Sequence, residues 1–281
     1  MKNIAVITGA TSGLGTEYAR QLAEMNYDLL LVARRENMLQ EVKREIESRS
    51  GVNVEYLVCD LAQAGEVRQL ESRLESMDNL EVMVNNAGFG RESGFPNVNA
   101  DDEEEMIRVH AVSLMRLSRS SLVPMCKRRK GYLINVASVA AFLHGKNSAE
   151  YCATKAYVLS LSKSIQSDVA GHGVRVQALC PGFTHTGFHD TAAMKASFRK
   201  DTTPGFLWLS APFVVRSSLR SIRGFWHRVV CIPSFRYKFL IFTILFTNLI
   251  GLNLSDWGYA IRARKKQDDR SESPQERRID G

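Results

Sequence analysis

Thr8-Gly9-Ala10-Thr11-Ser12-Gly13-Leu14-Gly15 decides the fold of this chain because of what lies on either side of it. The residues before it, 2–8, are rich in branched apolar side chains and are typical of a short buried strand. The residues after it, 18–23, have the apolar spacing of a helix. Glycines in such a turn let the backbone approach a ligand, and the helix N-terminus suits a pyrophosphate. The sequence therefore predicts a dinucleotide-binding turn. For the loop alone, a glycine-rich turn without a ligand is the alternative.

The second apolar run, 28–33, ends in Arg34 and Arg35. In dinucleotide-binding folds the tip of this strand faces the adenosine ribose, where an acidic residue holds a free 2′-hydroxyl and arginine suits a 2′-phosphate. The planar guanidinium matches phosphate geometry. We therefore expect NADP(H) rather than NAD(H), and two solvated arginines are the alternative.

Further strand-like runs alternate with helical patterns along the chain. Strands are expected at 52–58, 80–84, 131–137 and 174–179, and helices at 36–49, 66–77, 103–129 and 149–170. Polar or glycine-containing groups follow the strands, where open parallel sheets bind ligands. The alternation predicts an α/β fold with a doubly wound parallel sheet.

Tyr151 and Lys155 lie four residues apart, and Ser138 follows the strand expected at 131–137. On a helix this spacing places the phenol and the ammonium on one face, one turn apart. A neighbouring cation lowers the pKa of a phenol from its ordinary value of about 10. We therefore expect Tyr151 to exchange a proton near neutral pH. Taken alone, such a pair is more often an ordinary feature of a solvated helix face.

Several motifs occur together, namely Thr8 to Gly15, Asp60, Asn85-Asn86-Ala87-Gly88, Ser138, Tyr151-x-x-x-Lys155 and Pro181-Gly182. In this combination the chain resembles the short-chain dehydrogenase/reductase (SDR) superfamily, of the single-domain type, over residues 2–232. The resemblance implies a Rossmann-type three-layer α/β/α sandwich. The run 31–35 and the chain length are more similar to the ketoacyl-reductase and hydroxysteroid-dehydrogenase branch.

The resemblance also implies roles for individual residues. Ser138 would hold a substrate carbonyl oxygen, Tyr151 would exchange a proton with it, and Lys155 would bind the nicotinamide ribose. Taken singly, Ser138, Asp60 and Asn85-Asn86 are equally ordinary turn or cap residues. The residues that match the cofactor contacts of the family are Gly9, Thr11, Ser12, Gly13, Leu14, Gly15, Arg34, Arg35, Asp60, Leu61, Asn86, Ala87, Gly88, Tyr151, Lys155, Pro181, Gly182, Phe183 and Thr184.

The chain departs from the family at His110, where an asparagine usually helps to hold a water in a proton relay. Imidazole can also donate and accept, and it titrates near pH 6.5. Three outcomes stay open: a tolerated substitution in a slower enzyme, a relay with altered pH dependence, and loss of activity.

The composition fits a single enzyme domain. The 281 residues, 44% of them apolar, are enough for one domain with a full core. The five cysteines are scattered along the chain and form no CxxC motif. We therefore expect the protein to be in a reducing cytoplasm, and we do not expect a metal site. His185 and His189 form an HxxxH without a partner acid, which argues against zinc. No signal peptide is expected, because the chain starts with the first strand.

Positive charge is concentrated in residues 195–238, which hold nine basic residues and one acid, Asp201. This segment is also aromatic. The resemblance places the substrate lid at about 183–225 and the last strand at about 227–232. A basic, aromatic lid suits an apolar ligand with negative charge, such as an acyl chain on coenzyme A or on an acidic carrier protein, or an anionic membrane surface. A solvated basic face is the alternative. Nucleic acid is not expected, because the rest of the chain is balanced.

After the catalytic domain, 1–232, we expect an apolar extension at 233–260 and a charged, disordered tail at 261–281. As a helix the uncharged run 239–254 would span about 24 Å, less than the roughly 30 Å of a hydrocarbon core. We expect it to pack in an oligomer interface or lie on a bilayer surface. The long helices 103–129 and 149–170 suggest a homodimer or homotetramer, because relatives pair such helices between subunits.

The sequence as a whole predicts a cytoplasmic NADP(H)-dependent oxidoreductase, with membrane association left open. Its substrate would be the carbonyl, or the corresponding alcohol, of an apolar compound such as a ketoacyl thioester or a steroid-like ketone. The alternative is a non-catalytic dinucleotide-binding protein that acts in regulation or at a membrane surface.

Overall fold

The structure is a computed structural model that describes residues 2–91, 94–190 and 203–249. The middle of the expected lid, the end of the apolar run and the charged tail lie outside the described residues. The chain divides into two units, Met1–Tyr237 and Lys238–Gly281. The first unit therefore includes the whole predicted catalytic domain.

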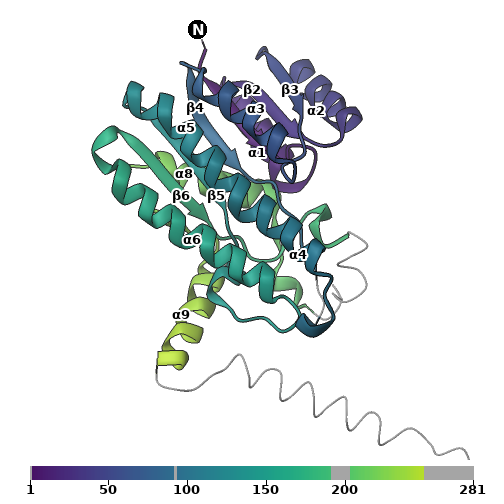
Figure 1. The fold of residues 1–281 in the computed structure, drawn as a ribbon. Helices are drawn as coiled ribbons and strands as arrows, with labels where there is room; N and C mark the ends of the chain where they lie inside the picture. Colours follow the sequence, from purple (N-terminus) through teal and green to yellow (C-terminus); the bar gives the residue numbers. More distant parts are fainter. Residues whose placement is uncertain (1, 92–93, 191–202, 250–281) are drawn as a thin grey trace, which may run out of the picture. The chain divides into compact units, whose positions relative to one another are not determined.

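A seven-stranded parallel sheet forms the centre of the first unit (Figure 1). Its order is β3-β2-β1-β4-β5-β6-β9, so the order reverses between β1 and β4. In open α/β sheets the ligand crevice lies at such a reversal, beyond the carboxyl ends of the strands. The strands are β1 (Ile4–Thr8), β2 (Asp28–Ala33), β3 (Val54–Val58), β4 (Leu80–Asn85), β5 (Gly131–Val136), β6 (Val174–Leu179) and β9 (Val230–Cys231).

Helices cover both faces of this sheet, which confirms the predicted doubly wound, three-layer α/β/α sandwich. One face packs against α1 (Gly13–Glu24), α2 (Glu36–Arg49) and α8 (Ala211–Arg223). The other face packs against α3 (Ala64–Glu75), α5 (Leu114–Arg128) and α6 (Ala149–Val169). Within the described residues, no helix is long and apolar enough to cross a membrane.

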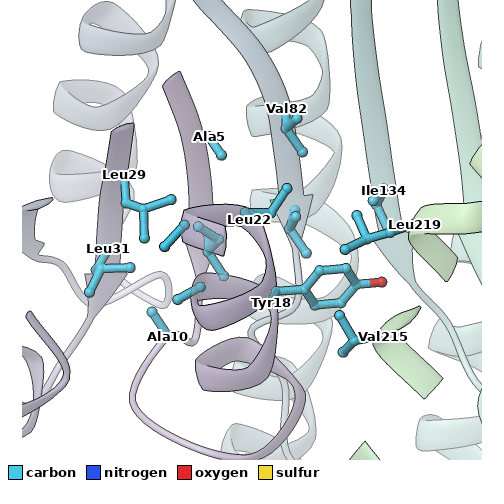
Figure 2. Packing of buried hydrophobic residues seen from close by; sticks show 14 of the residues in the cluster. Ala5, Ala10, Tyr18, Leu22, Leu29, Leu31, Val82, Ile134, Val215 and Leu219 are labelled. Carbon is cyan, nitrogen blue, oxygen red and sulfur yellow. The ribbon is translucent and has the colours of Figure 1, made fainter. Parts of the chain in front are cut away.

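The face that carries α1 shows how distant segments close the core. Figure 2 shows Tyr18 of α1 between the sheet and α8, close to Val215 and Leu219. The Tyr18 hydroxyl donates a hydrogen bond to Ser218 Oγ at 2.6 Å, and burial raises the pKa of this phenol. Because Ser218 lies on α8, this contact joins the two ends of the domain.

The predicted helix 103–129 is not a single helix, and this is the main correction to the expected elements. The structure has α4 (Ala100–Ile107), a π-helical turn (Arg108–Ser113) and then α5. A π-helical turn widens the helix and changes the direction of the side chains within it, and such turns are frequent at functional sites. The expected last strand, 227–232, is also shorter, because only Val230–Cys231 pairs with β6.

The second half of the expected lid is α8, whose inner face lies in the core. Val214, Val215, Leu219 and Ile222 are all buried. The first half contains β7 (Thr184–His185), which pairs in parallel with β8 (Leu209–Ser210). Between β7 and β8, residues 191–202 of the expected lid lie outside the described part of the chain, so the lid stays a prediction there.

Candidate active site

The glycine loop joins β1 to α1 in a backbone conformation that only glycine adopts easily. Gly9 and Gly13 have φ angles of 65° and 57°, in the left-handed region. A Cβ on Gly9 would lie 2.9 Å from Ala87 Cα, and one on Gly15 would lie 2.1 Å from Gly9 O. The loop therefore packs tightly on the chain after β4 and leads directly into the N-terminus of α1.

The Thr8 side chain fixes the glycine loop to the segment after β4. Its Oγ1 accepts the backbone N–H groups of Asn86 and Ala87, at 3.0 and 3.1 Å. The Asn86 amide donates in return to the carbonyls of Thr8 and Gly9, at 2.9 and 3.2 Å. Two predicted cofactor motifs are therefore one hydrogen-bonded unit at the carboxyl ends of β1 and β4.

Arg34 and Arg35 at the end of β2 point to different partners. Arg35 Nη2 donates to Thr11 Oγ1 on the glycine loop at 3.1 Å. Arg34 is 61% exposed, and its Nη1 lies 3.7 Å from the Glu105 carboxylate on α4. Only Arg35 is thus bonded to the glycine loop itself.

Asp60 and Leu61 follow β3 and shape the turn that leads to α3. Asp60 Oδ1 accepts the N–H of Ala62 at 3.0 Å, and its own N–H donates to Glu66 at 2.7 Å. Leu61 is buried, and its carbonyl accepts the Ser113 hydroxyl. Both residues have structural partners, so contact with an adenine stays a prediction.

Ser138 and Tyr151 meet beyond the carboxyl ends of β5 and β6. Ser138 has an extended backbone, and its Oγ accepts the N–H of Ala140 at 3.1 Å. The next residue, Val139, donates its N–H to Pro181 O at 3.0 Å, which ties this turn to the one after β6. Tyr151 lies in the first turn of α6 and forms a side-chain hydrogen bond with Ser138. The structure therefore brings these two side chains together, and their catalytic role stays a prediction.

The expected acidic shift of Tyr151 is wrong for the protein on its own. Burial raises the pKa of Tyr151 to about 12, although the hydrogen bond with Ser138 lowers it in part. Lys155 Nζ lies 5.6 Å from the centre of the phenol ring and is itself taken out of water. Burial lowers the pKa of Lys155 to about 8, so the side chain is only partly protonated near that pH. Removal from water outweighs the attraction of the neighbouring cation.

Lys155 is held by the backbone at the end of β5. Its Nζ donates to Val136 O at 2.9 Å. A Cβ placed on Gly88 would lie 3.6 Å from this ammonium, and Gly88 is exposed. The missing side chain at Gly88 therefore leaves the region beside Lys155 open to a ligand.

His110 occupies the π-helical turn and connects two parts of the site. Its Nε2 accepts the N–H of Phe89 at 3.0 Å, so the proton lies on Nδ1, which is 3.2 Å from Thr154 Oγ1. The Thr154 hydroxyl in turn donates to Tyr151 O at 3.0 Å. Burial and the Lys155 charge lower the pKa of His110 well below 6.5, so the expected titration near that pH is wrong.

Tyr237 is a residue of the site that sequence reasoning missed. It lies in the first turn of α9 (Phe235–Leu249), and its hydroxyl accepts the N–H of Phe183 at 2.9 Å and donates to Leu207 O at 2.8 Å. A Cβ on Gly182 would lie 1.9 Å from the ring carbon Tyr237 Cζ. The Pro181-Gly182-Phe183-Thr184 turn is therefore clamped from the C-terminal side. The apolar pattern around Tyr237 gave no sign of this contact.

The predicted absence of a metal concerns the histidines after β7. Among the described residues, no group of three His, Cys, Asp or Glu side chains could hold a metal ion. His185 is exposed, and its ring stacks on Trp208 at 4.9 Å between centroids. The side chain of His189 lies outside the description.

These features define a nucleotide-binding α/β protein with a Ser–Tyr–Lys group at the mouth of its sheet. The chain belongs to the short-chain dehydrogenase family, because the model of that family, described as short chain dehydrogenase, matches residues 3–196. An uncharacterised oxidoreductase of Staphylococcus saprophyticus is 32% identical over 202 residues, which cover 70% of this chain and 86% of that protein. Nodulation protein G of a Rhizobium species is 29% identical over 66% of this chain and 75% of its own length.

Solved structures of other proteins share this fold. A short-chain dehydrogenase from Sphingobium yanoikuyae in complex with NADPH has a TM-score of 0.77 and 27% identity, covering 99% of each chain. A Burkholderia phymatum relative in complex with NAD has a TM-score of 0.78 and 22% identity, covering 90% of this chain and 96% of its own. The chain is thus an oxidoreductase of the NAD(P)-dependent dehydrogenase type that acts on CH–OH groups.

Proposed function

We propose that this protein is an NADP(H)-dependent reductase of an apolar carbonyl compound, with Ser138, Tyr151 and Lys155 as its catalytic residues. The hydrogen bond between Tyr151 and Ser138, with Lys155 one helical turn further along α6, carries the proposal. The two hydroxyls converge where the turns after β5 and β6 meet, so one carbonyl oxygen can contact both.

The chain's own residues perform the proton chemistry in this proposal. Ser138 Oγ holds the carbonyl oxygen, and Tyr151 Oη gives it a proton during reduction or takes it back during oxidation. A phenol with a pKa of about 12 is protonated at neutral pH, which favours the role of proton donor and hence reduction. NADP(H), when bound, supplies or accepts the hydride.

The residues around the glycine loop fit a dinucleotide. Gly9, Gly13 and Gly15 place no side chain of their own beside the N-terminus of α1, where unpaired N–H groups suit a pyrophosphate. Asn86 to Gly88 and Pro181 to Thr184 would line the nicotinamide half, with Lys155 at its ribose. Asp60 and Leu61 would lie at the adenine.

The proposal is tested by replacing the proton donor. We expect Tyr151→Phe to lower the rate of NADPH oxidation by about 100-fold or more with a panel of apolar ketones and ketoacyl thioesters. NADPH binding, measured by fluorescence titration, should stay within about threefold of wild type. Tyr157→Phe on the same helix is the matched control and should keep full activity, since this tyrosine is exposed.

Cofactor choice is tested with the two arginines. We expect Arg35→Ala to weaken NADPH binding by about tenfold or more and NADH binding much less, because a charge-assisted bond to the 2′-phosphate is lost. Arg34→Ala is the paired variant, and its effect should be smaller because Arg34 faces Glu105. Equal losses for NADPH and NADH with Arg35→Ala would contradict the assignment.

The rival function is a dinucleotide-binding protein without turnover, and it rests on His110. Binding of NADPH with no oxidation across the panel, together with an inert Tyr151→Phe, would favour this rival. The intact hydrogen bonds of His110 to Phe89 and Thr154 support the enzyme instead, because they keep the site ordered.

The setting of the enzyme is also part of the proposal. None of the five cysteines, all of which lie in the described residues, forms a disulfide, which suits a reducing cytoplasm. Exposed apolar side chains on α5 and α6, such as Val123 and Tyr157, suit contact between subunits of a dimer or tetramer. Light scattering of the purified protein measures the number of subunits. An acyl-carrier protein would be the acidic partner if the substrate is carrier-bound.

A further inference from the structure

One side of α9 carries large apolar side chains that are open to solvent. Phe235, Phe239, Phe242, Phe246 and Leu249 follow one another at intervals of four and three residues, which puts them on one face of the helix. They are 78%, 63%, 65%, 52% and 83% exposed. We call these five residues the aromatic stripe. The rings of Phe242 and Phe246 stack with their centres 6.2 Å apart.

Such a surface is costly to leave in water. Removing large apolar side chains from water is favourable, and a contiguous exposed apolar patch marks an interaction site. The aromatic stripe contains none of the residues of the site described above.

In the sequence, the charged residues next to the aromatic stripe are all basic. Residues 202–255 contain no Asp or Glu. The exposed basic residues of this segment are Arg216, Arg220, Arg223, Arg228, Arg236 and Lys238. None of them forms an ion pair with a residue in the described ranges. A partner surface should therefore supply both an apolar region that can bury the stripe and negative charge.

A second exposed aromatic group lies in the same basic segment. Phe225 and Trp226 follow α8, are 88% and 84% exposed, and contact each other edge to face at 5.2 Å. Exposed Arg228 follows two residues later. Tryptophan and phenylalanine beside arginine are typical of segments that enter the boundary between headgroups and acyl chains.

A lipid surface explains these features better than a second copy of this chain. Two stripes packed against each other would bring together basic segments that contain no acid to pair with. Anionic headgroups would supply the missing charge, because their negative surface potential attracts Lys and Arg side chains. The 15 residues of α9 extend about 22 Å, too short to cross a hydrocarbon core of roughly 30 Å. The helix would therefore lie in the interface plane.

We propose that the aromatic stripe of α9, together with Arg236 and Lys238 of the same helix, binds the surface of an anionic lipid bilayer, with α9 lying in the plane of the interface. This inference goes beyond the proposed reductase and does not depend on it. It makes the protein a peripheral membrane protein, whatever the substrate.

The test is flotation of the full chain with vesicles of phosphatidylcholine alone or of phosphatidylcholine mixed equally with phosphatidylglycerol. We expect binding to the mixed vesicles to be about tenfold tighter or more, and to weaken as salt is raised. Phe242→Ser with Phe246→Ser should abolish flotation, whereas Phe242→Leu with Phe246→Leu should retain it. NADPH binding by each variant shows that the domain is intact.

The basic residues have their own matched variants. Arg236→Gln with Lys238→Gln should weaken binding to the mixed vesicles by about tenfold. Arg44→Gln with Lys163→Gln removes the same charge from exposed sites elsewhere and should have little effect. The proposal is overturned if the wild-type protein does not float with the mixed vesicles, or if the variant with Phe242→Ser and Phe246→Ser floats as well as wild type. It is also overturned if light scattering shows that these two substitutions dissociate an oligomer whose wild-type form does not bind vesicles. None of these readouts needs turnover, so a failed reductase assay leaves them unaffected.

Discussion

At the scale of single residues, burial determines the direction of the pKa shift of both Lys155 and Tyr151. The ammonium has one hydrogen bond, to Val136 O, and the phenol has Ser138. Neither partner is a charge that could offset the removal of Lys155 from water. The pKa of the lysine therefore falls and that of the tyrosine rises.

The buried lysine predicts a pH-dependent stability. Its pKa is about 8 when folded against 10.5 otherwise, so between these values the unfolded chain binds more protons and stability rises with pH. Below about pH 8 the full cost of the charge is present. We expect Lys155→Met to be more stable than wild type at pH 7 by roughly 2–3 kcal/mol in urea unfolding without cofactor, with the difference closing toward pH 10. Lys163→Met, at an exposed site, should show no such closing gap.

His110 should stay neutral wherever the protein is folded. Its Nε2 is occupied by the Phe89 N–H, and burial opposes a second proton. We expect the imidazole signal that is lost in His110→Asn to show no titration between about pH 5.5 and 8 in NMR spectra. A midpoint near 6.5 for that signal would show that the ring is accessible to water and that the hydrogen bonds described here do not persist.

The motifs could be predicted from sequence at this scale, but the electrostatics could not. Tyr151, Lys155 and Ser138 were identified by their spacing and by the strand that precedes Ser138. Whether the pKa of Tyr151 rises or falls depends on whether the effect of burial is larger than the effect of the neighbouring Lys155 cation. The depth of burial cannot be read from the sequence. In the same way His110 was identified as unusual, whereas its tautomer depends on Phe89 and Thr154.

At the scale of elements, the clamp between α9 and the turn after β6 is the feature that most directly shapes the site. Gly182 is required there because any Cβ would overlap the Tyr237 ring. The turn from Pro181 to Thr184 was predicted as part of the cofactor site. That it is held by a residue of the apolar C-terminal segment could not be predicted, since the contact joins positions 54 residues apart.

This clamp predicts a steric effect with a specific rescue. Gly182→Ala should destabilise the protein by about 1–3 kcal/mol, because the added methyl group must displace the Tyr237 ring. Gly182→Ala with Tyr237→Leu should be less destabilised than the sum of the two single variants. Gly205→Ala is the control, since nothing lies within 4 Å of its new Cβ. Thermal unfolding of the four proteins measures these differences, and strict additivity would contradict the clamp.

The interrupted helix from α4 to α5 shows another limit of sequence patterns. The apolar spacing of 103–129 is continuous, so the pattern predicts one helix. The π-helical turn at Arg108–Ser113 is set by tertiary contacts, such as Ser113 Oγ with Leu61 O and His110 with Phe89. Its position beside the site is thus a result of packing rather than of local preference.

For the whole molecule, the contact of Tyr18 with α8 links the first helix to the last helix of the sandwich. Ser218 Oγ accepts from Tyr18 and donates to Gln177 Oε1 at 2.5 Å. We expect Ser218→Ala to cost about 1–3 kcal/mol, because it leaves the buried phenol without a partner. Tyr18→Phe should cost less, and the double variant should cost less than the sum of both. Urea unfolding measures this coupling, and additive effects would show that the two hydroxyls act independently.

The order of the whole fold was predictable because parallel sheets have strong local signals. Buried runs such as 28–33 and 174–179 match β2 and β6 at both ends. The core contribution of α8 was not predictable, because its residues were assigned to a lid by resemblance. Basic and apolar residues alternate in that helix, and only the packing of its apolar face against α1 shows where it belongs.

The clamp at Tyr237 has a consequence for how the protein is made. Residues 138–184, which include Ser138, Tyr151 and Lys155, leave the ribosome before residue 237. The Phe183 amide, however, waits for a hydroxyl supplied by residue 237. A chain that ended before Tyr237 would contain Ser138, Tyr151 and Lys155 but would lack the hydroxyl that accepts this N–H, so we expect the turn from Pro181 to Thr184 to be less firmly held in it.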